Sequence, residues 1–495
     1  MNINIISNTY EKGKGIIKFD SDVTTIGNGK RYDNNSTFFP ELNKLTTISF
    51  PGTVSNIKQF AFCNYNDPGL KIVIINNRKN SLEIGRNAFD SCKELKTVDF
   101  GDGDLTIGNQ AFGGCTSLTT LNFPKSSSHI SIGNQAFYQC TGLTSIFLNP
   151  NTITNFDQYA FSGCTSLTTL NIPGSVESIG NFAFEYCRLT TLTISGSVGS
   201  IGGAAFSYCS FLTTLDITGS VGSMEYYAFQ HCISLTTINI TGSVNSINGA
   251  FSLDCSSLTT INIPGSVGNI VQNAFQNCTS LTTLNITGSV TNIGAGAFEG
   301  CTGLTTLDIS GTVGSLGFGA FQNCTGLTTI NIPGTVGSIS ASPFDGCTGL
   351  TTITISGSVG SITGGAFYNC PGLTTVTITG SVTTIGNGAF VGCTSLTTFD
   401  IPSSVTSIGN VAFQGCTSLT SITIPDSVES ISGQAFDGCT GLTSITISNT
   451  TPPTLGSQAF DNTNDSPIYV PSESVESYKA AENWSTYESR IQAIQ

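Results

Sequence analysis

The sequence predicts a β-rich fold: a right-handed solenoid of about 18 coils, in which the short strands of neighbouring coils pair in parallel. The first observation is a repeat of 23 residues, which begins at Cys301 and returns with almost the same sequence from Cys324 to Ser340. The second is that every copy places apolar residues at the same positions. The third is that one copy has too few apolar side chains to form a core alone, so coils must stack to bury them.

Each coil is predicted from its apolar positions, which begin with a leucine at position 1. Alternation predicts a first strand with Ile330 and Ile332 inward and the residues between them outward. A Pro-Gly, Ser-Gly or Thr-Gly pair then turns the chain, and a second short inward segment follows. The Ala-Phe-x-x-Cys stretch is too short for a stable isolated helix and is predicted to be a 3₁₀ or single helical turn. In the coil that starts at Leu327, positions 1, 4, 6, 10, 13, 18 and 21 are Leu327, Ile330, Ile332, Val336, Ile339, Phe344 and Cys347.

The regularity of the repeat divides the chain into three predicted parts. Residues 1–44 form an N-terminal capping region, which includes an insertion at Tyr32–Pro40. Residues 45–466 form the solenoid, irregular over 45–166 and regular over 167–448. Residues 467–495 form a C-terminal cap, because a solenoid needs a lid over its last coil.

The C-terminal cap is predicted to combine a strand and a helix. Ile468–Val470 is expected to be the last strand, and Ser472 is expected to cap a helix that runs to about Ala481. Trp484, Tyr487 and Ile491 are expected to cover the open end of the solenoid.

The 17 cysteines follow the repeat, with one in each coil over most of the chain. This spacing is neither the irregular spacing of a disulfide-rich domain nor the paired CxxC of a zinc site. Two interpretations stay open: a column of small buried hydrophobic side chains, or disulfides between neighbouring coils. The odd count and the shared inward position favour the first. Because Cys63 follows Phe62 directly, Tyr65 is expected to occupy the column in that coil.

The charge distribution excludes several classes of partner. The net charge is −14, and no Lys or Arg occurs between Arg188 and Lys479. Nucleic acids and anionic lipids require clustered cations, so neither is expected.

No apolar run reaches the ~20 residues of a membrane-spanning helix. The N-terminal residues do not resemble a secretory signal, because no basic segment is followed by an apolar one. We therefore expect either that the chain stays inside its cell or particle, or that an export signal has been removed.

The outward positions 3 and 5 of the first strands form two polar rows, which are the candidate binding surface on the expected concave face. Stacked Thr and Asn side chains also hydrogen-bond laterally, so a purely structural role stays open. A Thr lattice is also typical of ice-binding solenoids, but Asn and Asp interrupt it here. The candidate binding residues are Asp216, Thr237, Asn239, Thr260, Asn262, Thr283, Asn285, Thr306, Asp308, Thr329, Asn331, Thr354, Thr377 and Asp400.

Catalytic and metal-binding residues are not indicated, and no cofactor is expected. His129 and His231 are the only histidines and lie about four coils apart, so no nucleophile–histidine pair forms within one coil. Asp216, Asp308 and Asp400 stand four coils apart, too far to share a calcium ion.

The repeated pattern LxxLxIPxSVxxIxxxAFxxCxx resembles the BspA-like, Treponema-pallidum-type leucine-rich repeat, from about Val23 to Phe460. The resemblance extends to surface proteins of gut Bacteroidetes. It implies a leucine-rich-repeat solenoid without catalysis. It also implies a cell-surface or secreted adhesin that binds host matrix proteins, cell-surface proteins or glycans. The alternative is a structural or receptor-binding component of a bacteriophage particle, with an enzyme third.

Overall fold

The structure is a computed structural model that describes residues 5–11, 14–19, 23–27, 45–63, 69–76, 80–125, 129–150, 153–251, 255–339 and 342–494. The insertion expected at Tyr32–Pro40 and the column position expected for Tyr65 lie outside the described residues. The chain forms two compact units. Unit 1 comprises Met1–Asn245 and Gly249–Cys255, and unit 2 comprises Ser246–Asn248 and Ser256–Gln495.

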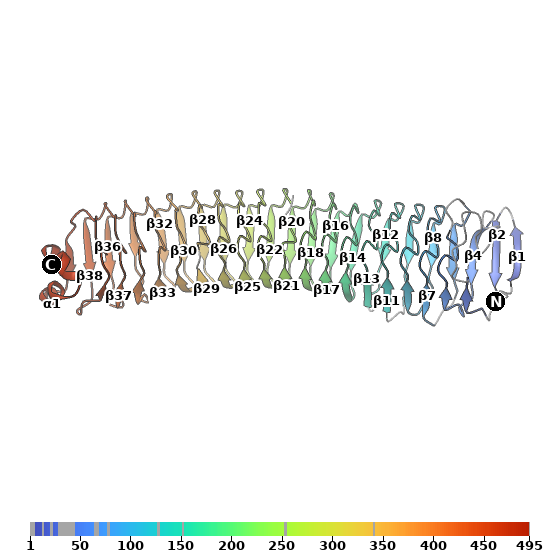
Figure 1. Ribbon diagram of the computed structural model, residues 1–495, viewed down its shortest axis with the longest axis horizontal. Coiled ribbons are helices and arrows are strands. Elements are labelled where there is room, and N and C mark those ends of the chain that lie inside the picture. Colours follow the sequence, from blue (N-terminus) through green and yellow to red (C-terminus); the bar gives the residue numbers. More distant parts are fainter. Residues whose placement is uncertain are drawn as a thin grey trace. The chain divides into compact units, whose positions relative to one another are not determined.

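Each unit is a parallel β-solenoid, as predicted, with two strands in a regular coil (Figure 1). We call the strands that contain positions 3 to 6 of a coil front strands. Those that contain positions 9 to 13 are back strands. In both sets, a strand pairs with the corresponding strand of the next coil, so strands of one set follow each other in chain order.

In unit 1 the front strands begin with an antiparallel hairpin of the first two strands, after which the pairing is parallel. The front strands are β1 (Ile5–Glu11), β2 (Lys14–Phe19), β4 (Leu45–Phe50), β6 (Ile72–Ile75), β8 (Thr97–Asp99), β10 (Thr120–Asn122), β12 (Ser145–Phe147), β14 (Thr169–Ile172), β16 (Thr191–Ile194), β18 (Thr214–Ile217) and β20 (Thr237–Ile240). The back strands are β3 (Thr25–Ile26), β5 (Asn56–Ile57), β7 (Leu82–Ile84), β9 (Leu105–Ile107), β11 (His129–Ile132), β13 (Ile153–Phe156), β15 (Val176–Ile179), β17 (Ser197–Ile201) and β19 (Ser220–Met224). Strand β21 (Ser243–Ile247) contains residues of both units.

Unit 2 repeats the arrangement. Its front strands are β22 (Thr260–Ile263), β24 (Thr283–Ile286), β26 (Thr306–Ile309), β28 (Thr329–Ile332), β30 (Thr352–Ile355), β32 (Thr375–Ile378), β34 (Thr398–Asp400), β36 (Ser421–Ile424), β38 (Ser444–Ile447), β40 (Ile468–Val470) and β41 (Ile491–Ala493). Its back strands are β23 (Ser266–Ile270), β25 (Ser289–Ile293), β27 (Thr312–Leu316), β29 (Thr335–Ile339), β31 (Ser358–Ile362), β33 (Val382–Ile385), β35 (Ser407–Ile408), β37 (Ser430–Ile431) and β39 (Thr454–Leu455).

The pairing register matches the repeat. Strand β28 pairs with β30 so that Ile330 lies beside Ile353 and Asn331 beside Thr354. Because side chains of a strand alternate between its two faces, equal positions of successive coils form inward and outward columns. The inward column is fully buried: Ile330 and Ile353 are both 0% exposed.

The Ala-Phe-x-x-Cys stretch forms what we call the turn segment, and it is not a continuous helix. The amides of Gln322 and Cys324 each donate to the carbonyl oxygen three residues earlier, as expected for 3₁₀-type turns. The intervening Asn323 has a left-handed φ of 58° and donates instead to Asp345 of the next coil. Every second amide therefore bonds across coils, which makes the turn segments a further stacked column.

The phenylalanines of the turn segments stack along the solenoid. The ring of Phe321 lies 5.2 Å from that of Phe298 and 5.4 Å from that of Phe344, measured between centroids. The planes of the first pair differ by 5°. Phe321 is fully buried and fills the end of its coil, as predicted.

The C-terminal segment contains a helix, as predicted: α1 (Val475–Ala480) lies between the short 3₁₀ helices η2 (Ser472–Ser474) and η3 (Trp484–Arg490). The prediction that Ser472 caps it was wrong, because Ser472 begins η2 and the residue before α1 is Ser474. Trp484 is fully buried, and its ring centroid lies 5.9 Å from that of Phe460. The prediction of β40 as the last strand was wrong, because β41 pairs with β40 in parallel. Ile491 was expected only to cover the open end of the solenoid, because it is apolar. In the structure it does so as the first residue of strand β41.

Candidate functional site

The polar rows of the front strands face outward, as the alternation predicts. In unit 2 the row at position 5 runs through six successive strands, from β22 to β32. The side chains in this row are Asn262, Asn285, Asp308, Asn331, Thr354 and Thr377. The row at position 3 runs beside it with a threonine in each coil: Thr260, Thr283, Thr306, Thr329, Thr352 and Thr375.

The same rows exist in unit 1, where β18 pairs with β20. Thr214 lies beside Thr237, and Asp216 lies beside Asn239. The Asn239 amide Nδ2 donates a hydrogen bond of 2.7 Å to Asp216 Oδ1. All the candidate residues predicted in either unit are at least partly accessible to solvent.

Asp400 lies in the coil after Thr377. It ends β34, which packs beside β32 and begins the next run of paired front strands, where Asp400 lies beside Thr423. The part of the row whose strands are paired without a break runs from Asn262 to Thr377.

Asp308 interrupts the hydrogen bonding of this row. The Asn285 amide Nδ2 donates a bond of 2.9 Å to Asn262 Oδ1, so amides can link neighbouring coils. Asp308 has only acceptor oxygens when ionised, and its buried Oδ1 has no hydrogen-bond partner in the described structure. A buried acceptor without a donor costs free energy, so Asp308 is the position in the row where an added donor would stabilise most.

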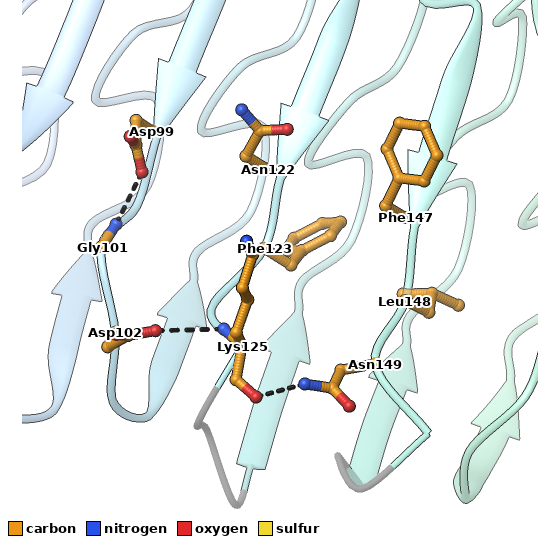
Figure 2. A pocket seen from close by; sticks show the side chains of 9 residues that line it. All are labelled: Asp99, Gly101, Asp102, Asn122, Phe123, Lys125, Phe147, Leu148 and Asn149. Atoms are coloured by element: carbon orange, nitrogen blue, oxygen red, sulfur yellow. Dashed lines mark hydrogen bonds between the residues drawn. The ribbon is translucent and has the colours of Figure 1, made fainter.

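A surface pocket of about 650 Å³ lies on the front strands of unit 1, where β8, β10 and β12 end (Figure 2). Asp99, Asn122 and Phe147 occupy position 5 of three successive coils, and their strands are paired in register. Phe147 is 64% exposed, and Figure 2 shows its ring beside Leu148 at one side of the pocket. The pocket therefore combines an exposed ring with polar side chains of the same row.

Backbone hydrogen bonds hold the carboxylates of this pocket. The Gly101 amide donates to Asp99 Oδ1 and the Lys125 amide donates to Asp102 Oδ1, both at 3.1 Å. Asn149 Nδ2 in turn donates to the Lys125 carbonyl oxygen. Fixed acceptors beside an aromatic ring suit a ligand that offers hydroxyl or amide donors and an apolar face.

The sequence predictions missed this pocket, because the predicted binding residues begin at Asp216. The available signal was Phe147, a large aromatic residue at a position that every later coil of the repeat fills with Asn, Asp or Thr. Its significance depends on Asp99 and Asn122 lying beside it, which requires the coil register.

The repeat matches the family model described as BspA type leucine rich repeat region (6 copies) over residues 33–149, 130–252, 248–374 and 360–481. The chain belongs to this BspA-type family. Its fold is the leucine-rich-repeat solenoid, an architecture that proteins typically use to bind other proteins and that is generally non-enzymatic.

Solved structures show similarity to this BspA-type chain at low identity. A leucine-rich repeat protein from Bacteroides ovatus is 21% identical, with 100% of both chains covered and a TM-score of 0.45. A leucine rich cell surface protein from Faecalibacterium prausnitzii is 23% identical, covering 88% of this chain and 90% of that one, with a TM-score of 0.25. A leucine-rich repeat protein from Eubacterium ventriosum is 18% identical, covering 81% and 90%, with a TM-score of 0.27. No curated protein matches the chain.

None of the seventeen cysteines of this BspA-type chain, all of which the structure describes, forms a disulfide, and sixteen of them are buried. Cys63, which follows Phe62 directly, is partly exposed. Burial raises the pKa of the Cys187 and Cys278 thiols to about 12. Thiols that stay protonated are poor nucleophiles, so the column is structural.

The two histidines are not brought together: His129 begins β11, and His231 lies in a turn segment with its ring 4.4 Å from that of Tyr208. Within the described ranges, no group of three or more His, Cys, Asp or Glu side chains is placed to hold a metal ion. A search of the same ranges finds no helix with the length and apolarity to cross a membrane.

Proposed function

We propose that this BspA-type chain is a non-enzymatic binding scaffold that recognises proteins or glycans through the polar rows of its front strands. The observation that carries the proposal is the row from Asn262 to Thr377, in which six outward side chains lie on successive paired strands. At a strand spacing of ~4.8 Å, such a row offers regularly placed donors and acceptors to an extended ligand.

Asp308 supports a binding role for this row over a purely structural one. An asparagine at this position would continue the amide bonding that joins Asn262 to Asn285. The carboxylate instead leaves one oxygen without a donor. A purely structural row would favour the asparagine, because the carboxylate carries the cost of a buried acceptor without a donor.

The proposed location is the cell surface or the secreted fraction, and the proposed partners are host matrix proteins, cell-surface proteins or glycans. Both follow from the resemblance to BspA-like adhesins. The acidic composition, with a net charge of −14, favours partners with basic or neutral contact surfaces.

The test is a triple variant, Asn262→Lys, Asn285→Lys and Asn331→Lys, probed on an array of extracellular-matrix proteins and an array of oligosaccharides. Surface substitutions of this kind change stability by about 0.5 kcal/mol or less each, so the variant is expected to fold. Every array member bound by the unmodified chain is expected to lose its signal. Unchanged binding by the folded variant would contradict the proposal.

The matched control places lysines on the back strands of the same three coils, at Ser266, Ser289 and Thr335, all of which are exposed. Positions closer to the middle of these strands are unsuitable. A Cβ atom built at Gly337, for example, would lie 2.2 Å from the Gly314 carbonyl oxygen. The control carries the same added charge, so it should keep the binding that the triple Asn variant loses.

A further inference from the structure

Exposed apolar side chains of unit 1 are concentrated in a short stretch of coils that lies outside the polar rows. Of the eleven large hydrophobic residues that are exposed in the described chain, six lie between residues 186 and 233. An exposed cluster of this kind marks an interaction surface more often than scattered single residues do. We call it the aromatic patch: Tyr186, Tyr208, Phe211, Tyr226, Tyr227 and Ile233.

The rings of the patch are arranged by the coil stacking. Tyr208 stacks on Tyr186 at 4.7 Å and on His231 at 4.4 Å, measured between ring centroids. These three residues directly precede the cysteine in successive turn segments. Tyr226 and Tyr227 are tilted by 53° to each other and are each about half exposed, and the Tyr226 ring lies against Gly249.

Several rings of the aromatic patch occupy positions whose backbone conformation does not favour large side chains. In the four coils between residues 159 and 232, the residue just before the alanine of the turn segment and the residue just before its cysteine have positive φ. Between residues 159 and 231, six of these eight positions carry rings, with φ between 56° and 63°: Tyr159, Phe182, Tyr186, Tyr208, Tyr227 and His231.

Unit 2 shows what these positions hold when no patch is present. Its left-handed residues at the same two positions include no aromatic side chain: Asn273, Asn277, Gly296, Gly300, Gly319, Asn323, Ser342, Gly346, Gly365, Asn369, Gly388, Gly392, Val411, Gly415, Gln434, Gly438, Gln458 and Asn462. Left-handed backbone is strained for bulky side chains and tolerated by Gly and Asn. The rings of unit 1 therefore carry a local backbone cost, and strain of this kind is typical of functional positions.

The charges around the patch favour a cationic ligand. The guanidinium of Arg188 lies over the Phe211 ring, 5.1 Å from its centroid. This contact shows how a cation packs on a ring of the patch itself. The carboxyl groups of Glu185 and Glu225 directly precede Tyr186 and Tyr226 in the chain. No further Lys or Arg follows Arg188 before Lys479, so the surrounding charge is acidic.

We propose that the aromatic patch docks a basic segment of a partner protein, with arginine or lysine side chains lying on the ring faces and edges that no neighbouring residue covers. Aromatic faces attract cations, and arginine stacks on them most often. The phenolic oxygens of Tyr186 and Tyr208 accept hydrogen bonds from guanidinium groups, and the carboxylates of Glu185 and Glu225 supply opposite charge. The net charge of −14 steers such a segment toward the chain. This site is separate from the polar rows and does not depend on their proposed role.

The test compares two variants of the full chain in titrations with a fluorescent eight-residue peptide of alternating Arg and Ser. The patch variant is Tyr186→Asn, Tyr208→Asn and Tyr227→Asn, which introduces the residue that unit 2 uses at these positions and keeps every charged group. The control variant, Asn273→Gly, Asn277→Gly and Asn323→Gly, changes the equivalent positions of unit 2. Fluorescence anisotropy gives the dissociation constant, and circular dichroism checks the fold.

The unmodified chain and the control variant are expected to bind the Arg–Ser peptide equally, and the patch variant about tenfold more weakly. Binding should weaken between about 50 mM and about 300 mM NaCl, and a Glu–Ser peptide should not bind. Equal binding by the patch variant would overturn the proposal, because attraction by net charge would then explain it. Binding of cellohexaose but not of the Arg–Ser peptide would also overturn it, in favour of a glycan site. Should the triple variant not fold, Tyr227→Asn alone is titrated with the same peptides and judged by the same outcomes.

Discussion

The Cys324 thiol donates a hydrogen bond of 3.2 Å to the carbonyl oxygen of Phe298, the phenylalanine of the turn segment one coil earlier. The relationship repeats along unit 2: Cys301 bonds to Phe275 at 3.3 Å and Cys347 bonds to Phe321 at 3.2 Å. The cysteine column therefore links successive coils through single thiol donors as well as filling space.

Replacement of Cys324 by alanine is expected to lower the free energy of unfolding by about 1 to 2 kcal/mol. The variant loses the thiol bond to Phe298 and leaves a small void among fully buried neighbours. Urea unfolding followed by circular dichroism measures the change. Cys63→Ala is the matched control, because Cys63 is only partly buried; an equal loss in the control would contradict a specific role for the buried column.

Alkaline pH is expected to destabilise the fold through the same thiols. Burial raises the pKa of Cys187, Cys278 and Cys324 from 9.0 to about 12. Below pH 9 the thiols are protonated in both states, so their contribution is fully present. Between pH 9 and 12 the unfolded chain loses protons that the folded chain keeps, and stability falls by about 1.4 kcal/mol per pH unit for each thiol.

The measurement is the urea midpoint at about pH 8 and about pH 10.5. A midpoint that stays constant or rises over this range would mean that the thiols are accessible and ionise in the folded chain. A variant with Cys187, Cys278 and Cys324 replaced by alanine should lose part of the pH dependence.

Phe321→Ala is expected to cost about 3 to 5 kcal/mol locally, because it removes a fully buried ring that stacks on Phe298 and Phe344. In a repeat architecture each coil contacts only its neighbours, so the adjacent coils should loosen before distant ones. Hydrogen exchange measured by peptide mass spectrometry would show lost protection around residues 298–344. Uniform loss along unit 2 would contradict the nearest-neighbour account.

Asp308→Asn is expected to stabilise unit 2 by about 0.5 to 1.5 kcal/mol. The amide can donate within the row and replaces a carboxylate that has one buried oxygen without a partner. Thermal unfolding measures the shift, and Asp216→Asn is the control, because Asp216 already accepts a bond from Asn239. Destabilisation by Asp308→Asn would show that the carboxylate is favoured within the row and would weaken its proposed role in binding.

The repeat by itself determined the architecture. Residues such as Ile330, Ile332 and Phe321 return at one position in every coil, and a coil with one apolar side must stack on its neighbours to bury it. The same alternation determined that Asn262 and Asn331 face outward, since side chains on a strand alternate between its two faces.

Only the tertiary structure decided which residues of different coils meet. Tyr186 and Tyr208 are 22 residues apart in the chain, and only the stacking of turn segments places their rings together. Their left-handed backbone is likewise invisible in the sequence, because hydrogen bonds to the next coil impose it against the preference of the side chain. The partners of the Cys324 thiol and the neighbours of Phe147 in the pocket also depend on coil register. The physical reason is common to all of them: a period fixes what repeats within a coil, whereas contacts between unlike residues depend on the exact register between coils.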